Sequence, residues 1–464
     1  MWLAALLALT LTAAPDDGLD PSVAQKLITE AVDSRGAYAL LTQLVDATGP
    51  RLSGSPGADR AVAWGVEQFQ ALGLEARKEP VLVPVWVRGV ERGEVLGAPG
   101  RPATPLALTA LGGSPGTPPG GIEAEVVEVS SLAELRDRGA SVKGRVVFFN
   151  HSMAVAADYK RFGELRSKGP AEAAKLGALA ALVRSLATAS LRSPHTGAAQ
   201  FPAGGRSIPA AAISVEDAEL LHRLLAKGPV RVHLELGCKI LPDATSFDVV
   251  AELRGRERPE EVVLVGAHLD SWDLATGAQD DGAGVAVVVE AAKLLAKLPV
   301  RPRRTVRFVL FMNEENGLRG AKTYAADHGA DVDRHVAAME FDAGAGKPLG
   351  VAVKAGPGGA AIVERWLPPL VPLGAGVLSG EEAGGADLTP LAPARVPVVQ
   401  LIQDSSRYFD IHHSAADTLD KVDPEAFSKT SGAATWLIYA LAESPEVLPR
   451  PPAPPPAAAS GTGQ

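Results

Sequence analysis

Acidic residues and histidines recur at the ends of apolar runs in the C-terminal half of this chain. The run VVLVGAHLD ends in His268 and Asp270, FVLFMNEE ends in Glu314 and Glu315, and HVAAMEFDAG leads to Asp342. Apolar runs of this length, alternating with helical patterns, predict the buried strands of a largely parallel sheet. Because an α/β sheet collects its chemistry at the ends of such strands, we expect a functional site there.

Two further clusters belong to the same series. Asp280 and Asp281 open the helical pattern that follows the first of these strands, and His412 and His413 follow a β-like segment near the C-terminal end. Each cluster alone has an ordinary explanation, because aspartates often cap helices and adjacent histidines can simply lie on the surface. Five clusters in this order are far more informative than any one of them.

The residue types suit a pair of metal ions. One histidine, one shared aspartate and a second aspartate would satisfy one ion, and the shared aspartate, a glutamate and a histidine would satisfy the other. Nitrogen and oxygen ligands without thiolate fit two zinc ions that keep positions open for water and substrate. A carboxylate at the helix start, at Asp280, could bridge the two ions.

The remaining acidic residues fit supporting roles. Asp270 lies two residues after His268, so its carboxylate could accept a hydrogen bond from the imidazole and fix its tautomer. Adjacent strand residues point in opposite directions, so one of Glu314 and Glu315 could bind metal while the other faces the attacking water as general base.

At these residues the chain resembles the co-catalytic zinc exopeptidases, the family of secreted aminopeptidases and glutamate carboxypeptidases. The family pattern runs H-x-D, D-D-G-x-G, E-E, D and H-x-x-x-D-T, and each step is met here in order. The segments DATGPRLSGS, SPHTG and HHSAADTLDKVDP look like segments of the glutamate carboxypeptidases within this family. This likeness covers most of the chain and not the motifs alone.

The resemblance implies a role for each clustered residue, with two Zn²⁺ per chain. The implied ligands are His268, Asp280 and Asp342 for one ion, and Asp280, Glu315 and His413 for the other. Glu314 would be the general base and Asp270 would orient His268. His413 is favoured over His412 because it stands at the first position of H-x-x-x-D-T. The family often has a cis peptide after the shared aspartate, which predicts one between Asp280 and Asp281.

Substrate contacts are expected near the last ligand. His412 and Tyr408 lie beside it in the sequence, and Asp387 lies in the loop GEEAGGADL that precedes it. His195, in the segment SPHTG, could reach the site at a domain or subunit interface, although a histidine on a surface loop is the alternative.

The resemblance predicts an α/β zinc-exopeptidase fold, with a largely parallel mixed sheet between helices and an inserted protease-associated domain. We expect a signal peptide at 1–14, an N-terminal part of the peptidase domain at 20–107, the inserted domain at 108–241, the catalytic core at 242–449 and a disordered Pro/Ala-rich tail at 450–464.

Composition narrows the location and partners of the protein. The formal net charge of -9, without a basic run, argues against nucleic acid as a partner. The apolar N-terminal stretch predicts a secreted or periplasmic protein, and no other stretch is long enough to cross a bilayer. The lone Cys238 excludes an internal disulfide. The resemblance also implies a homodimer.

The predicted reaction is hydrolysis of dipeptides or other short peptides by water bound between two metals. An aminopeptidase acting on longer peptides is the main alternative, because the sequence leaves open which peptide terminus is anchored. A single-zinc acyltransferase of the glutaminyl cyclase kind and a non-catalytic ectodomain, as in the transferrin receptor, are alternatives on related folds.

Overall fold

The computed structural model describes residues 18–97, 101–189 and 191–453. The expected signal peptide at 1–14 therefore lies outside the described residues, and the expected tail is described only as far as residue 453. Within the described ranges, no helix is both long enough and apolar enough to span a membrane.

The larger sheet of the described chain has seven strands in the order β1-β10-β12-β11-β13-β15-β14. These are β1 (Glu75–Val87), β10 (Lys239–Leu253), β11 (Arg258–His268), β12 (Arg304–Phe311), β13 (His335–Glu340), β14 (Pro348–Lys354) and β15 (Val398–Gln403). The central neighbours β12, β11, β13 and β15 run parallel, whereas β1, β10 and β14 pair antiparallel. The expected α/β fold with a mixed sheet is confirmed, and its parallel part is confined to the centre.

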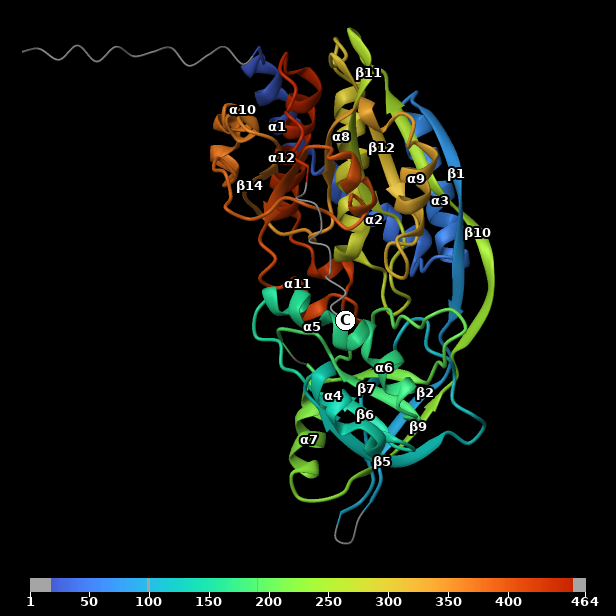
Figure 1. Ribbon diagram of the computed structural model, residues 1–464. Coiled ribbons are helices and arrows are strands. Elements are labelled where there is room, and N and C mark those ends of the chain that lie inside the picture. The colour runs from blue at the N-terminus through green and yellow to red at the C-terminus, as the bar shows by residue number, and fades with distance from the viewer. Residues whose placement is uncertain (1–17, 98–100, 190, 454–464) are drawn as a thin grey trace, which may run out of the picture.

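Helices cover both faces of this sheet (Figure 1). They are α1 (Pro21–Ser34), α2 (Gly36–Thr48), α3 (Pro56–Ala71), α8 (Ala283–Ala296), α9 (Arg319–Asp327), α10 (Gly359–Glu364) and α12 (Pro424–Glu443). The short helix α11 (Tyr408–Ile411) lies instead beside α5 (Ala157–Ser167), where its Phe409 packs against the apolar cluster that contains Phe162. Val263 and Val265 of β11 belong to the same apolar core as Val287 of α8, whereas Leu264 packs in a second core with Tyr324 of α9. Because side chains alternate along a strand, an uninterrupted apolar run buries both faces at once.

A second sheet, eight-stranded among the described residues, has the order β3-β2-β9-β5-β6-β7-β8-β4. Its strands are β2 (Glu91–Val95), β3 (Thr104–Pro105), β4 (Leu108–Ala110), β5 (Ile122–Val129), β6 (Val146–Phe149), β7 (Ala180–Arg184), β8 (Ala210–Ile213) and β9 (Arg231–Leu236). Its helices are α4 (Leu132–Arg138), α5 (Ala157–Ser167), α6 (Gly169–Lys175) and α7 (Val215–Leu225). Figure 1 shows this second layer below the first, with the long strands β1 and β10 running down toward it.

The second sheet has apolar cores of its own. Phe148 and Leu182 pack on one face of the sheet, and Val147 and Val183 pack on the other. Some members of the first core come from elsewhere in the chain: Trp86 lies in β1 of the larger sheet, and Trp272 follows β11. The two layers therefore meet at the loop that leaves β11.

Candidate metal centre

Neighbouring parallel strands of the larger sheet end side by side at one edge. β11 ends at His268, β12 ends at Phe311 and β13 ends at Glu340. The register pairs His268 with Phe311, and Gly266 with Glu340. The residues that follow these strands are thus delivered to one place, although they are far apart in the sequence.

Asp280 lies between two groups of side chains at this edge. Its Oδ1 atom is 3.1 Å from Nε2 of His268, and its Oδ2 atom is 3.2 Å from Nε2 of His413. Oδ1 of Asp342 is 3.7 Å from the same His268 nitrogen. Oε2 of Glu315 is 3.0 Å from the same His413 nitrogen. The five side chains expected to bind metal therefore come together as two sets that share Asp280.

The chemistry of this cluster fits metal ions. Oδ2 of Asp280 and Oε1 of Glu315 are buried and have no hydrogen-bond partner among the described residues. Ligand atoms of His268, Asp280 and Glu315 lie within 4.8 Å of one another. Burying carboxylates without donors is costly, and a divalent cation bound by nitrogen and oxygen atoms would offset that cost.

The pKa shifts at the cluster also favour metal binding. Burial lowers the pKa of His268, but its contacts with Asp280 and Asp342 outweigh burial and raise that pKa well above its usual value. Burial and the charge of Asp280 raise the pKa of Glu315 to about 7. The acidic side chains thus favour positive charge in their midst, which a metal ion would supply while displacing protons.

Glu314 is placed differently from its neighbour. Its side chain is partly exposed and lines the same cleft as Asp280 and Asp342. Burial raises the pKa of Glu314 well above its usual value, and the charges of Asp342 and Glu315 add to that shift. A carboxyl group with a raised pKa, open to the cleft, is suited to accept and return a proton.

Asp270 supports Glu314 more directly than it supports His268. Its Oδ1 atom accepts hydrogen bonds from the backbone N–H groups of Asn313, at 2.8 Å, and of Glu314, at 3.0 Å. Nδ1 of His268 lies 3.1 Å from the carbonyl oxygen of Asp270 but 3.8 Å from its carboxylate. The contact that orients the imidazole is therefore made by the backbone, which corrects the carboxylate contact expected from the sequence.

Two further aspartates hold the backbone around Asp280. Asp281 accepts hydrogen bonds from the N–H groups of His268, at 3.1 Å, and Gly284, at 3.0 Å. Asp417 accepts hydrogen bonds from the N–H groups of Gln279, at 2.7 Å, and Asp280, at 3.1 Å. The peptide bond between Asp280 and Asp281 is cis, so that expectation is confirmed.

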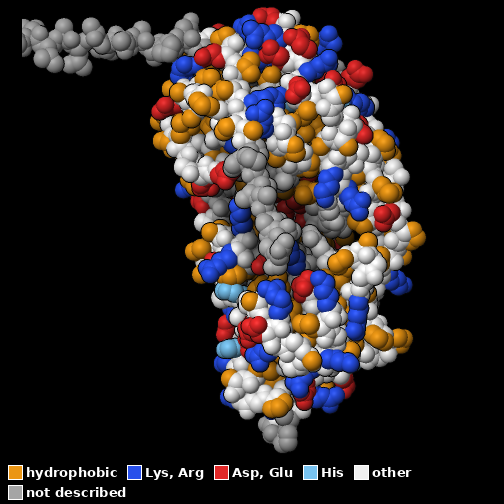
Figure 2. Space-filling model, in the orientation of Figure 1, with side chains coloured by type: hydrophobic (Ala, Val, Ile, Leu, Met, Phe, Trp, Pro, Cys, Tyr) orange, Lys and Arg blue, Asp and Glu red, His pale blue; other side chains and the backbone are white. Residues whose placement is uncertain are grey.

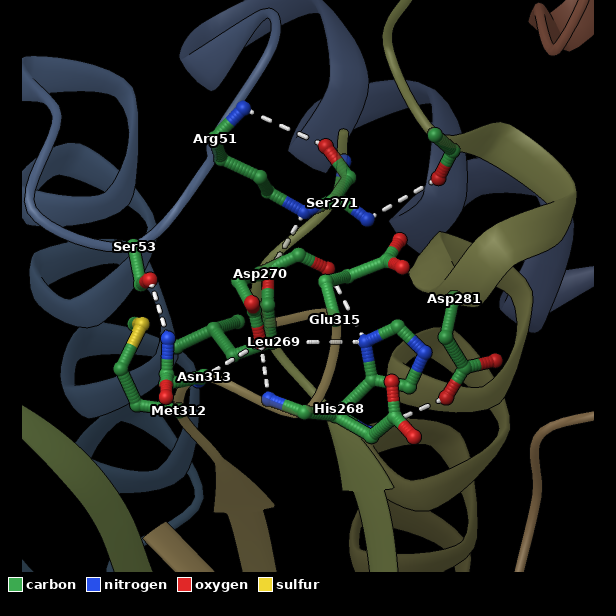
Figure 3. Close-up of polar contacts among 12 residues, drawn as sticks. Arg51, Ser53, His268, Leu269, Asp270, Ser271, Asp281, Met312, Asn313 and Glu315 are labelled. Carbon is green, nitrogen blue, oxygen red and sulfur yellow. Dashed lines mark hydrogen bonds and ion pairs between the residues drawn. The ribbon is translucent and has the colours of Figure 1, made fainter. Parts of the chain in front are cut away.

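Arg51 is a supporting residue that sequence reasoning missed. The side chain is fully buried and crosses to the loop after β11, as Figure 3 shows. It donates hydrogen bonds to the carbonyl of Leu269 at 2.7 Å, to that of Gly277 at 2.9 Å, and to that of Thr276. Burial lowers the pKa of Arg51, opposed by the charges of Asp417 and other site aspartates. Its only sequence signal is one arginine within a turn-rich segment.

His413 is held partly by Thr196, in the connection between β7 and β8 of the second sheet. Nδ1 of His413 is 3.2 Å from the carbonyl oxygen of Thr196, and the N–H of Thr196 donates to the carbonyl of His413 at 2.8 Å. His412 stacks on His413 with ring centroids 3.5 Å apart, and its Nε2 is 3.5 Å from Oδ2 of Asp280. His413 approaches the carboxylates of both Asp280 and Glu315, whereas among the described residues His412 approaches the carboxylate of Asp280 alone.

The residues expected to contact substrate separate into two groups. Tyr408 and His412 line the cleft beside the cluster. Asp387 and His195 are buried and are not among the described residues that line it. Both carboxylate oxygens of Asp387 are without hydrogen-bond partners among the described residues. Burial, with the charge of His413, lowers the pKa of His195 to about 4, so its imidazole is neutral at neutral pH.

The cleft above the cluster has a volume of about 1620 Å³. It reaches from the acidic residues to the start of α9 on one side and to the loop 200–205 on the other. Figure 2 shows it as a hollow with acidic side chains inside and Lys or Arg side chains beside it. Arg166 and Tyr159 of α5 also line it, so both layers contribute to its walls.

Known proteins are similar to this chain in sequence and in fold. The model of peptidase family M28 matches residues 248–437. Human carboxypeptidase Q is 40% identical over 437 residues, which covers 92% of this chain and 90% of the human protein. The crystal structure of a peptidase M28 precursor from Shewanella amazonensis superposes with a TM-score of 0.90 at 39% identity, over 94% of this chain and 100% of that one. A zinc aminopeptidase from Bacillus subtilis shares the fold, with a TM-score of 0.66 at 21% identity over 89% of this chain and 98% of that one.

The contacts of Arg51 predict a loss of stability when they are removed. Arg51→Met removes three hydrogen bonds to backbone carbonyls, and each lost hydrogen bond is worth about 1 kcal/mol. The carbonyl of Gly277 keeps a donor, the N–H of Gly282, whereas no other donor to the carbonyls of Leu269 and Thr276 is found among the described residues. We expect the free energy of unfolding to fall by about 3 kcal/mol in urea titrations. The exposed Arg223→Met is the matched control and should unfold like wild type. An Arg51→Met protein as stable as this control would show that Arg51 does not brace the loop.

Proposed function

Because this chain belongs to peptidase family M28 and is a metallo-exopeptidase, we propose that it hydrolyses dipeptides or other short peptides with two zinc ions bound at the Asp280 cluster. The observation that carries the proposal is the position of Asp280, whose two oxygens face two separate sets of nitrogen and oxygen atoms. A second supporting observation is a free carboxyl group, that of Glu314, facing the same cleft.

The proposed ligands follow the two sets. His268, Asp280 and Asp342 would hold one zinc ion, and Asp280, Glu315 and His413 would hold the other. His413 is preferred to His412 because its Nε2 approaches carboxylates of both Asp280 and Glu315. When bound, the zinc ions would supply positive charge that polarises the scissile carbonyl and acidifies water.

Glu314 would act as the general base. Its carboxylate would remove a proton from the attacking water and return it to the leaving amine. Asp270 fixes the turn that carries Glu314 by accepting the N–H groups of Asn313 and Glu314. That support keeps the base directed at the cleft while the neighbouring Glu315 points to His413.

Arg166 supports recognition of a free peptide carboxylate. Its guanidinium donates to the hydroxyl of Tyr159 at 2.7 Å and to the carbonyl of Thr196 at 3.2 Å, but it pairs with no carboxylate among the described residues. Its buried Nε atom has no partner there either. A guanidinium on the cleft wall without an acidic partner is suited to bind a substrate carboxylate. This favours a carboxypeptidase or dipeptidase over an aminopeptidase.

The volume of the cleft also fits the alternative function, an aminopeptidase that acts on longer peptides. Pockets for small ligands typically measure about 300–1,000 Å³, whereas this cleft measures about 1620 Å³. The extra space lies toward α9 and the loop 200–205, so longer peptides also fit. Comparing dipeptides with longer peptides that share the same last two residues decides between these lengths.

Further parts of the proposal concern the whole protein. The second sheet with its helices would be the inserted protease-associated domain, since it has apolar cores of its own. The N-terminal apolar stretch supports a secreted or periplasmic location. A homodimer is also proposed, on the resemblance to glutamate carboxypeptidases, and light scattering of the purified protein tests it.

The role of Glu314 predicts an enzyme that keeps its metal and loses turnover. Glu314→Gln removes the proton acceptor but leaves the proposed ligands in place. We expect kcat to fall about a hundred- to ten-thousand-fold, the range for loss of a general base, while the zinc content of the protein is unchanged. The exposed Glu67→Gln on α3 is the control and should keep full activity. Unchanged turnover of Glu314→Gln would rule out Glu314 as the base.

The role of Arg166 predicts selective loss of substrates that carry a free C-terminal carboxylate. A hydrogen bond to a charged group contributes about 1.5–3 kcal/mol, so Arg166→Met should lower kcat/KM for such peptides about ten- to a hundred-fold. Peptides with an amidated C-terminus should be affected much less. Arg161→Met, an exposed neighbour on α5, is the matched control. Equal losses for free and amidated peptides would contradict carboxylate binding by Arg166.

A further inference from the structure

We infer that residues which connect the strands of the second layer are part of the metal centre, because Thr196 and Arg88 position His413 and link it to the loop after His268. This inference rests on the proposed function, since it concerns how a proposed metal ligand is held. It assigns to the second layer a role in metal binding, in addition to lining the substrate cleft.

The carbonyl of Thr196 sets which nitrogen of His413 is free to bind metal. Nδ1 lies 3.2 Å from that carbonyl and 3.3 Å from Nη1 of Arg166, which donates to the same carbonyl at 3.2 Å. Nε2 faces Asp280 and Glu315 at 3.2 and 3.0 Å. A proton on Nδ1, donated to the carbonyl, leaves the lone pair on Nε2 directed at the cluster. Thr196 therefore acts on the metal site through His413 and is a positioning residue.

His413 also depends on Thr196 for its backbone conformation. Its φ angle is 59°, in the left-handed region that few residues other than glycine adopt. The N–H of Thr196 donates to the carbonyl of His413 at 2.8 Å. The same residue thus contacts both the backbone and the imidazole of His413, so a shift of Thr196 would move the imidazole.

Thr196 is itself fixed by the end of β4. Its side chain is fully buried, and its hydroxyl donates to the carbonyl of Ala110 at 2.8 Å. The same carbonyl accepts a hydrogen bond from Nη1 of Arg88 at 2.8 Å. The N–H of Gly112 also donates to the carbonyl of Gly197 at 3.0 Å. The Ala110 carbonyl is therefore a shared anchor for Thr196 and Arg88.

Arg88 extends this connection to the other end of the cluster. Its guanidinium makes two parallel contacts with Asp273, at 2.8 Å from Nε to Oδ2 and 2.6 Å from Nη2 to Oδ1. The Arg88 side chain is only 14% exposed, which makes this paired geometry stronger than a typical surface ion pair. Asp273 lies in the loop that leaves β11 after His268 and Asp270. Hydrogen bonds therefore link the loop of one metal set to the histidine of the other.

The side chain of Trp272 also connects the loop after β11 with His413. Its side chain is buried in the apolar core of the second sheet, and its ring lies edge-on to that of His413 with centroids 5.7 Å apart. A side chain at Gly112 would approach this ring to 2.1 Å, so the close packing requires glycine there. Packing and hydrogen bonds thus fix the position of the two layers relative to each other at the metal site.

The test measures metal affinity instead of activity. Intact wild-type protein and variants are titrated with Zn²⁺ against a chromogenic chelator. Thr196→Val removes the hydroxyl donor while keeping the shape of the side chain. Substitution of a residue that hydrogen-bonds to a metal ligand typically weakens metal binding about 10- to 100-fold. For Thr196→Val we expect a loss of zinc affinity near the lower end of that range. Thr196→Ser, which restores the donor, should recover most of the affinity.

Thr435→Val is the matched control. Thr435 is also fully buried and its hydroxyl also donates to a carbonyl, that of Ser431, at 2.8 Å, but it lies within α12. It should lose a similar amount of stability and no zinc affinity. If Thr196→Val binds zinc as tightly as wild type, or if Thr196→Ser is no better than Thr196→Val, the inference is overturned. A wild-type protein that binds no zinc would instead overturn the proposed function.

A double-variant measurement tests the connection through Arg88. Asp273→Asn should weaken zinc binding as well, because it breaks the paired contact with Arg88. Residues in one hydrogen-bonded network have non-additive effects, whereas independent sites add. We expect the combination of Asp273→Asn with Thr196→Val to weaken binding by less than the product of the two single effects. An effect equal to that product would contradict the connection.

Discussion

The structure depends most on how Asp280 is held between two sets of side chains. One of its oxygens faces His268 and the other faces His413, so a small rotation would break one set. Asp417 accepts the N–H of Asp280, and Asp281 accepts the N–H of His268. These contacts, together with the buried Arg51 beneath the loop, hold the backbone and the side chain of Asp280 in one conformation.

Each of the two layers supplies different residues to this site. The larger sheet supplies strand ends, which deliver His268, Glu315 and Asp342 to one edge. The second sheet supplies the acceptor for His413 and one wall of the cleft, through Thr196 and Arg166. Substrate recognition and metal binding are therefore expected to respond together when the contact between the layers is disturbed.

The sequence predicted the parallel core and the grouping of the clustered residues, because parallel strand ends leave few other places for them. It did not reveal Arg51, Thr196 or Arg166, whose partners lie far away in the chain and leave no periodic signal. The prediction that the carboxylate of Asp270 contacts the imidazole of His268 was also wrong. Alternation of side chains applies only within a strand, and β11 ends at His268, so the next turn presents a carbonyl instead of a carboxylate to the imidazole.

Metal content of the Asp280→Ala protein tests the central claim most directly. Because Asp280 belongs to both proposed zinc sites, wild-type protein should hold two zinc ions per chain by elemental analysis after dialysis, and Asp280→Ala should hold almost none. Circular dichroism of the variant is the control for whether it remains folded. Retention of one full equivalent of zinc by folded Asp280→Ala would mean that Asp280 serves a single ion, and would contradict the shared position on which the account rests.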